Sequence, residues 1–166
     1  MSPVGPVAPA RRADVVMRPS TEADREFLVD LYGSTRDEEL SQVAWAPGQR
    51  EAFVRMQFTA QDTEYRRHNP HGSFDVVEVD GRAVGRLIVD RRAGDIRIVD
   101  ISLAPHARGA GIGSQLLGDL IEEARSTGCI VSIHVEVHNR AAELYARHGF
   151  VVAADLGIYR RMEWAG

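Results

Sequence analysis

A glycine-rich turn between a predicted strand and a predicted helix constrains this chain more than any other feature. The turn reads Arg108-Gly109-Ala110-Gly111-Ile112-Gly113 and precedes an amphipathic stretch. Glycines let backbone N–H groups turn toward one point, and the start of a helix adds free N–H groups and partial positive charge. Arg108 adds a full positive charge. The sequence therefore predicts a seat for a pyrophosphate.

Three other interpretations of this turn fit less well. A Walker loop ends in Gly-Lys-Ser or Gly-Lys-Thr, and Gly113-Ser114 lacks the lysine. A dinucleotide fingerprint has the spacing Gly-x-Gly-x-x-Gly after a first strand, whereas this turn has Gly-x-Gly-x-Gly in the second half of the chain. A glycine-rich turn that binds nothing is the third interpretation, and the arginine and the strand–turn–helix context argue against it.

The pattern of apolar residues predicts strands and helices in alternation. Strands are expected over 14–18, 74–79, 83–90, 96–103, 129–137, 151–154 and 158–164. Helices are expected over about 21–33, 48–67, 111–126 and 140–148. A helix between two strands that could pair side by side implies a crossover in a mixed sheet.

Local signals mark several boundaries. Thr21 and Asp24 have the spacing of a capping box, and Gly33 is expected to end the first helix. Residues 34–46 read as a loop. Asp80-Gly81 predicts a hairpin turn, and a second turn is expected over 92–95.

The strand before the glycine-rich turn shows a slip in its apolar register. Ile96 and Ile98 share one face at period two, whereas Val99, Ile101 and Leu103 share the other parity. A β-bulge near Ile98-Val99 produces such a slip. A strand buried on both faces would also explain it, so both interpretations stay open.

Size and charge limit the classes of function. The chain has 166 residues, 44% hydrophobic and 27% charged, as expected for one folded domain. A net charge of −4 argues against a nucleic-acid partner, and no apolar run approaches the roughly 18 residues of a membrane span. We expect residues 1–13 to be a disordered tail without a secretory signal and 14–166 to be the domain. Cys129 is the single cysteine, which fits a reducing cytoplasm.

Three segments together resemble the GNAT (GCN5-related) N-acetyltransferase family. Arg108-x-x-Gly111-x-Gly113 matches the family signature Gln/Arg-x-x-Gly-x-Gly/Ala, and the preceding segment 101–105 is similar to the family's fourth strand. The segment from Asn139 to Phe150 resembles its second hallmark, an Asn before a helix that carries Leu-Tyr and ends in Gly-Phe. The order of elements agrees from about residue 14 to the end.

The resemblance implies a fold and an activity. The fold would be α/β, a mixed twisted sheet of six to seven strands with helices on both faces and a splayed central strand pair. The activity would be transfer of an acetyl group from acetyl-CoA to a primary amine of a small molecule or peptide, without a metal. A CoA-binding sensor or interaction module that has lost transfer is the alternative, and a homodimer is possible because many members of the family pair.

The resemblance also assigns residues to the cofactor. The backbone around Leu103 would pair with the pantetheine arm, the amides from Arg108 to Ser114 would hold the pyrophosphate, and Asn139 would contact the pantetheine or cap the following helix. The residues expected to bind acetyl-CoA are Ile101, Ser102, Leu103, Arg108, Gly109, Ala110, Gly111, Ile112, Gly113, Ser114, Asn139 and Tyr145.

Tyr145 matches the tyrosine that often protonates the leaving CoA thiolate in this family, and packing against Leu144 and Phe150 is its other possible role. The candidates for a base that deprotonates the amine are Asp100 and Glu136, with His134 as a third and a chain of water as a further possibility. Asp95 is expected to belong to a turn.

The acceptor side gives little signal. In this family the first two helices and their loop usually shape the acceptor pocket. Aromatic and long side chains there could line a pocket or belong to the core; they are Tyr32, Trp45, Phe53, Met56 and Gln57.

Overall fold

The structure is a computed structural model that describes residues 14–166. The expected tail over 1–13 lies outside the described residues. The strands are β1 (Val15–Pro19), β2 (Ser73–Val79), β3 (Arg82–Arg92), β4 (Asp95–Leu103), β5 (Ile130–Glu136), β6 (Val151–Asp155) and β7 (Tyr159–Trp164). The helices are η1 (Glu22–Asp24), α1 (Arg25–Thr35), α2 (Asp37–Leu40), α3 (Gln49–His68), η2 (Pro105–Ala107), α4 (Ile112–Thr127) and α5 (Ala141–Arg147).

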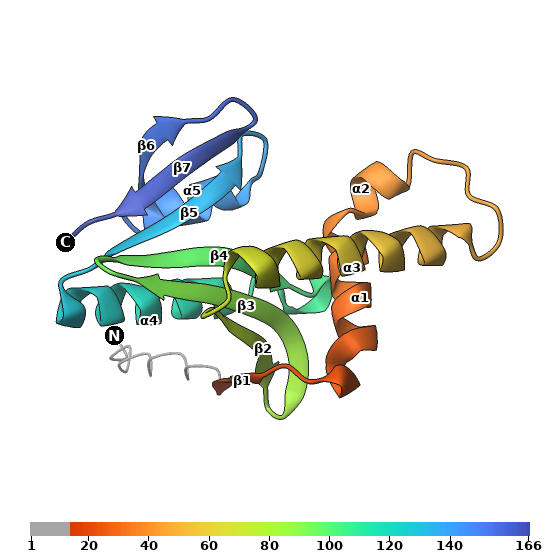
Figure 1. Cartoon of the computed structure of the whole chain (residues 1–166), viewed down its shortest axis with the longest axis horizontal. Helices are drawn as coiled ribbons and strands as arrows, with labels where there is room; N and C mark the ends of the chain where they lie inside the picture. The colour runs from red at the N-terminus through yellow and green to blue at the C-terminus, as the bar shows by residue number, and fades with distance from the viewer. Residues whose placement is uncertain (1–13) are drawn as a thin grey trace, which may run out of the picture.

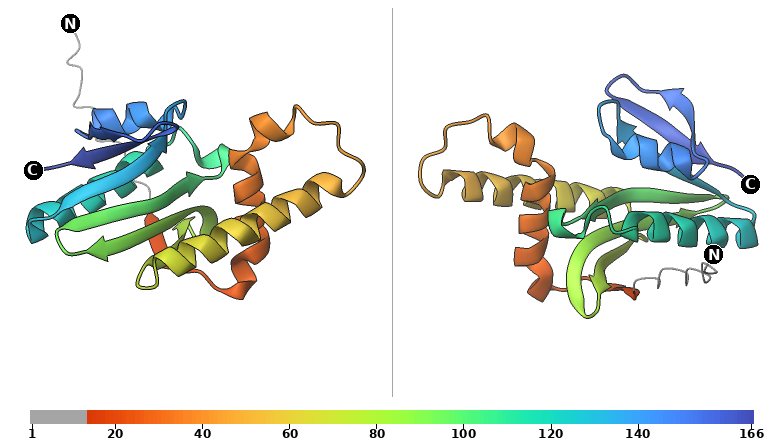
Figure 2. Two further views of the ribbon diagram at one scale, coloured as in Figure 1. Left: turned by 45° about the horizontal axis from the view of Figure 1, so that its top comes forward. Right: turned by 180° about the vertical axis from the view of Figure 1, so that it is seen from behind.

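The seven strands form one mixed sheet in the order β1-β2-β3-β4-β5-β7-β6. Every neighbouring pair is antiparallel except β4 and β5, which are parallel and are joined through α4. Figure 1 shows α3 in front of the sheet and α4 behind it, and the reverse view in Figure 2 shows α4 and α5 on that rear face. The α/β fold with helices on both faces is as expected.

The predicted bulge lies in β4. Ile88 stands opposite Asp100 and Val89 stands opposite Ile98, so Val99 is the extra residue on β4. The bulge shifts the side-chain alternation by one residue. The apolar residues before the bulge, Ile96 and Ile98, and those after it, Ile101 and Leu103, therefore face the same apolar cluster. The interpretation as a bulge is confirmed.

The two central strands separate just after this bulge. Pairing between β4 and β5 begins at Asp95 with Ile130 and ends at Ile98 with Ile133. Residues 99–103 of β4 have no partner on the β5 side, while on the other side they continue to pair with β3. Figure 1 shows β5 turning away from β4 there. The expected splayed strand pair is thus present.

The two faces of the sheet differ in chemistry. The rear face packs against α4 and α5 through an apolar cluster that includes Leu87, Ile98, Leu117, Val131 and Tyr145. Cross-strand partners share a face, so the front face can be read from the register of the strands. We call the following side chains the polar face: Arg86, Asp90, Asp95, Arg97, Asp100, Ser102, Ser132, His134, Glu136, Arg161 and Glu163.

A second apolar cluster joins α1 to α3. Gly33 was expected to end the first helix, but α1 continues to Thr35. A Cβ on Gly33 would lie 3.1 Å from Val54 Cγ1, so the glycine permits close packing of α1 on α3 and does not end the helix. The expected loop over 34–46 contains the short helix α2.

The element boundaries correct one further expectation and confirm two others. Asp95 was assigned to a turn, but it is the first residue of β4, and Gly94 with φ 73° makes the turn instead. The capping box of Thr21 and Asp24 is present at the start of η1. The hairpin at Asp80-Gly81 is also confirmed, between β2 and β3.

Candidate active site

The glycine-rich turn adopts a conformation that requires glycine. Gly109 has φ 76° and Gly111 has φ 83°, both in the left-handed region that side chains disfavour. No atom lies within 4 Å of a Cβ built on either residue, so the space beside both is open. Gly111 directly precedes α4, whose first N–H groups have no partner within the helix.

A groove of about 550 Å³ runs from this turn along the first turns of α4. It is lined by Ala110, Gly111, Ser114, Gln115, Gly118, Asp119 and Glu122. The first three were expected at the cofactor, and the last four extend that stretch along one side of the helix. The groove is open beside the N-terminus of α4. The free N–H groups and partial positive charge of a helix N-terminus are what an anion such as a pyrophosphate requires.

Other predicted cofactor residues lie around the strand gap. Arg108 Nε donates to the Leu103 carbonyl oxygen over 3.0 Å, which ties the turn to the end of β4. Asn139 Oδ1 accepts from the Ala141 N–H over 2.9 Å, so Asn139 caps α5 as expected. Gly113 lies where α4 contacts α5, because a Cβ on Gly113 would be 3.3 Å from Leu144 Cδ2.

Tyr145 lies on α5, behind the sheet. Its ring is buried and packs against Phe150 with 5.9 Å between ring centroids. Its hydroxyl has no hydrogen-bond partner among residues 14–166. Every fully buried side-chain oxygen in that range does have a partner, so the Tyr145 hydroxyl oxygen must be accessible to solvent. Burial, and then the negative charge of Asp100, raise the pKa of Tyr145 well above its usual value. The phenol is therefore neutral at physiological pH.

Asp100 lies on the polar face beside the gap. Arg86 Nε donates to Asp100 Oδ2 over 2.9 Å, and the Ser102 hydroxyl donates to the same oxygen over 2.9 Å. Oδ1 accepts no hydrogen bond from the described residues. Arg86 is buried and is held in turn by Gln61 on α3 over 2.8 Å. One oxygen of Asp100 is thus fixed by the protein and the other is available.

Tyr65 completes this cluster from α3. Its ring lies 5.8 Å from the guanidinium carbon of Arg86. Burial, and then the charge of Asp100, raise the pKa of Tyr65 to about 12. The negative charge of Asp100 thus raises the pKa of two tyrosines, Tyr65 on α3 and Tyr145 on α5.

Glu136 lies at the far end of β5. Its carboxylate is 3.8 Å from a guanidinium nitrogen of Arg36, and the Arg36 guanidinium lies over the ring of Tyr32. The Glu136 side chain is 48% exposed, much more than that of Asp100 at 19%. Glu136 therefore stands at the open mouth of the gap, while Asp100 is deeper.

The residues expected near the acceptor lie on and around the cluster between α1 and α3. Tyr32 is buried in that cluster, and Trp45 packs against it. The ring of Phe53 is tilted against that of Trp45 with 5.3 Å between centroids, while Met56 is exposed and Gln57 is half-buried. Among the described residues, no hydrogen bond, ion pair or ring contact joins any of these side chains to Asp100 or Tyr145. Sequence reasoning instead missed Gln61, Tyr65, Arg86 and Tyr159, which stands opposite Glu136.

Residues 14–166 lack the features of two other kinds of site. No helix in this range has both the length and the apolar character needed to cross a membrane. No group of three or more His, Cys, Asp or Glu side chains in it could hold a metal ion.

Solved structures share this architecture. PaiA N-acetyltransferase from Thermoplasma acidophilum, in complex with coenzyme A, is 17% identical with a TM-score of 0.68, over 92% of this chain and 99% of that one. An acetyltransferase from Thermus thermophilus is 17% identical with a TM-score of 0.67, over 92% and 97%. YncA from Salmonella typhimurium, solved with its cofactor acetyl-CoA, is 20% identical with a TM-score of 0.56, over 92% and 94%. These likenesses define the class, a protein with the acetyltransferase fold.

The sequence identifies the family within that class. The acetyltransferase (GNAT) family matches residues 36–150, which is more than half of the chain. The chain therefore belongs to the GNAT acetyltransferase family, and the resemblance found in its motifs is confirmed. Membership indicates an acyl-CoA-dependent acetyltransferase.

Proposed function

We propose that this protein transfers an acetyl group from acetyl-CoA to a primary amine of a small molecule or peptide. We base this proposal on the gap between β4 and β5, which opens beside the glycine-rich turn and has Asp100 on the part of β4 that no longer pairs with β5. Acetyl-CoA would supply the activated acetyl group as a thioester.

The residues of the turn and the gap fit that cosubstrate. Backbone N–H groups from Arg108 to Ser114 would hold the pyrophosphate, since the open space beside Gly109 and Gly111 lets an anion approach the backbone. On its β5 side, the backbone of 99–103 has no strand partner, and it would form hydrogen bonds with the amides of the pantetheine as with an added strand. Asn139 would contact the pantetheine from the start of α5.

The proton transfers would use the two groups at the gap. The incoming ammonium must lose a proton before it attacks, and Asp100 Oδ1 would accept that proton because Oδ2 is already held by Arg86 and Ser102. Tyr145 would donate its hydroxyl proton to the departing thiolate sulfur. Glu136 is the second candidate base, and its ion pair with Arg36 places it nearer to solvent.

His134 is less suited to be the base. Its Nε2 lies 3.1 Å from a guanidinium nitrogen of Arg97, which is always a donor, so Nε2 accepts a hydrogen bond. Burial and the charges of Arg97 and Arg161 lower the pKa of His134. A histidine whose lone pair is already engaged is a poor acceptor for a further proton.

The alternative function is a CoA-binding module without transfer. Release of free thiol from acetyl-CoA, followed with amino acids, polyamines, aminoglycosides and peptide N-termini, separates the two. Steady thiol release with at least one amine supports the enzyme. Thermal stabilisation by acetyl-CoA without thiol release across that set supports the binding module, because a ligand of the native state stabilises it without being turned over. Stabilisation by NAD or ATP instead would favour another type of phosphate loop.

Two further parts of the proposal concern the whole protein. A cytoplasmic location is proposed from the single cysteine, Cys129. A homodimer is also proposed, and the molar mass in solution tests it.

A further inference from the structure

Arg97 on the polar face is a buried arginine without an ionic partner. It is 8% exposed, and no carboxylate of the described residues lies within 4.0 Å of its guanidinium. Its hydrogen bonds go to two neutral groups: Nε donates to the Ser132 hydroxyl over 2.8 Å, and one terminal nitrogen donates to His134 Nε2 over 3.1 Å. Buried charges are normally paired, so this arginine calls for an explanation.

Donors of Arg97 remain available. A guanidinium has five N–H groups, and the two hydrogen bonds use one on Nε and one on a terminal nitrogen. The other terminal nitrogen has no partner among residues 14–166. Every fully buried side-chain nitrogen in that range has a hydrogen-bond partner, so this terminal nitrogen of Arg97 must be accessible to solvent. Arg97 therefore presents its charge to the polar face from below.

His134 provides a second donor beside it. Since Nε2 accepts from Arg97, the neutral ring carries its hydrogen on Nδ1, which makes no hydrogen bond to the described residues. Burial and the neighbouring arginines lower the pKa of His134, so the ring keeps this form at neutral pH. The side chain is exposed, and Nδ1–H can donate to a bound molecule.

The nearby carboxylates are held by other partners. Asp95 accepts from the Ser132 hydroxyl over 2.7 Å and lies 3.5 Å from Arg161. Arg161 Nε also donates to Glu163 over 2.6 Å. Asp90 pairs with Arg92 over 2.9 Å. Of the three arginines here, Arg97 is the one with no direct ion pair among the described residues.

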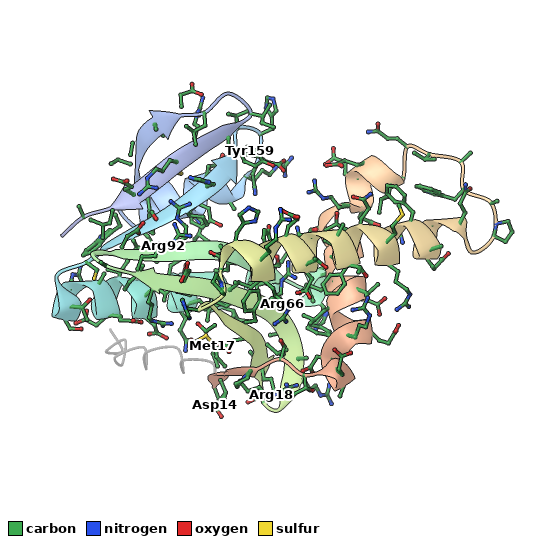
Figure 3. The ribbon with its side chains drawn as sticks, in the orientation of Figure 1. Asp14, Met17, Arg18, Arg66, Arg92 and Tyr159 are labelled. Atoms are coloured by element: carbon green, nitrogen blue, oxygen red, sulfur yellow. The ribbon has the colours of Figure 1, made fainter. Side chains whose placement is uncertain are left out.

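The position of this pair relative to the gap determines what it could bind. Arg97 and Asp100 share the polar face of β4, three residues apart, which is roughly 10 Å along a strand. On β5, His134 likewise lies nearer the closed end of the gap and Glu136 nearer the open end. In Figure 3 this face runs between the labelled Arg92 at the closed end and Tyr159 at the open end, and no helix lies in front of β5 and β7. A molecule on the face could reach both positions.

We propose that Arg97 and His134 bind a carboxylate of the acceptor while its amine lies at Asp100. The acceptor would then be an ω-amino acid, or a lysine side chain with a free carboxylate, with five or six carbons between the two groups to span roughly 7–10 Å. This substrate class rests on the proposed function, because the amine position is the proposed site of transfer. The carboxylate subsite itself stands on Arg97 and His134 alone.

Three probes, two of them matched in length, test the subsite. They are 6-aminohexanoate, hexylamine, which lacks the carboxylate, and glycine, which is too short to span the two positions. Titration calorimetry with the protein saturated in coenzyme A measures binding without turnover. We expect 6-aminohexanoate to bind at least 10-fold more tightly than hexylamine or glycine, as expected for charge-assisted hydrogen bonds to one carboxylate.

The variants separate Arg97 from its surroundings. Arg97→Met keeps much of the side-chain volume and should bring the affinity for 6-aminohexanoate to within about twofold of hexylamine. Arg91→Gln is the matched control, since Arg91 stands opposite the core residue Ile96, pairs with Glu123 of α4 on the other face of the sheet, and should leave the preference intact. Circular dichroism checks that each variant folds. If Arg97→Met does not fold, ring NMR signals of His134 in the wild type decide, because 6-aminohexanoate must shift them and hexylamine must not.

Equal binding of 6-aminohexanoate and hexylamine, no binding of either, or a preference that survives in Arg97→Met would overturn the subsite. Thiol release with hexylamine would still occur in those cases if the enzyme proposal holds. Conversely, an Arg97-dependent preference without thiol release from acetyl-CoA would keep the subsite and contradict the enzyme. The two failures are therefore distinguishable.

Discussion

Arg86 and Asp100 form an ion pair of 2.9 Å on the polar face, at the point where β4 leaves β5. The pair orients one carboxylate oxygen toward the protein and leaves the other toward the gap. Arg86 is held by Gln61, so a residue of α3 controls the direction of a carboxylate on β4. Removing Asp100 would leave a buried guanidinium without its charge partner, which costs about 3 kcal/mol of stability in typical cases.

Asp100→Asn should reduce turnover by roughly 100- to 10,000-fold, because the amide keeps the shape and cannot accept the proton of the ammonium. Glu136→Gln, at the open mouth, should change turnover by less than about 10-fold. Steady-state thiol release with one amine substrate measures both, with acetyl-CoA binding as the check that each variant is folded. If Glu136→Gln shows the large loss and Asp100→Asn the small one, the base is Glu136.

Tyr145→Phe keeps the contact with Phe150 and removes only the hydroxyl. We expect unchanged folding, similar acetyl-CoA affinity and a fall in turnover of roughly 10- to 1,000-fold. Phe150→Leu serves as the packing control, since it should lower the melting temperature and affect turnover less. Full activity in Tyr145→Phe would mean that Tyr145 only packs and that solvent protonates the thiolate.

Gly111→Ala should weaken acetyl-CoA binding at least 10-fold, because the new Cβ projects into the open space beside the turn where the pyrophosphate would lie. Gly128, at the other end of α4, has φ 70° and equally open surroundings. Gly128→Ala therefore carries a similar backbone cost of about 1 kcal/mol without touching the groove. Calorimetry on both variants separates the two effects. Equal acetyl-CoA affinities would contradict the assigned phosphate seat.

Acid should weaken the fold through Asp24. Hydrogen bonds from Arg18, 2.7 and 2.8 Å long, lower the pKa of Asp24 to about 2. Because the folded pKa lies below the unfolded value of about 4, this carboxylate stabilises the fold above pH 4 and loses that contribution as the pH falls toward 2. Asp24→Asn should flatten the loss of stability in that window, measured by urea unfolding.

The matched control for that experiment is Glu26→Gln. Glu26 also pairs with an arginine, Arg55, over 2.8 Å, but its side chain is 73% exposed. Exposed pairs contribute little, so this variant should keep the wild-type pH dependence. Identical pH curves for wild type and Asp24→Asn would show that Asp24 does not set the acid limit.

The features that could be predicted from the sequence are local ones. The positive-φ glycines of the phosphate turn, the bulge at Val99 and the cap by Asn139 each arise from a few neighbouring residues whose chemistry determines the backbone. The parallel crossover followed from the order of elements. The family resemblance and most of the residues expected to bind acetyl-CoA were identified from these local features.

The missed features depend on contacts between distant segments. Arg86 is 14 residues from Asp100 and 25 from Gln61, and no local pattern relates them. Gly33 was taken as a helix end because sequence alone does not show that Val54 would pack against it. The polar face likewise depends on the strand register, so the role of Arg97 could not be inferred before β4 and β5 were aligned.

Mass spectrometry of the acceptor shows whether the protein moves an acetyl group onto an amine. The protein is incubated with acetyl-CoA and an amine that supports thiol release, and the products are separated and weighed. We expect an amine that carries one acetyl group on nitrogen, formed in step with free coenzyme A, and much less of it with Asp100→Asn. Free acetate in place of the acetylated amine, or an equal yield from Asp100→Asn, would contradict this expectation.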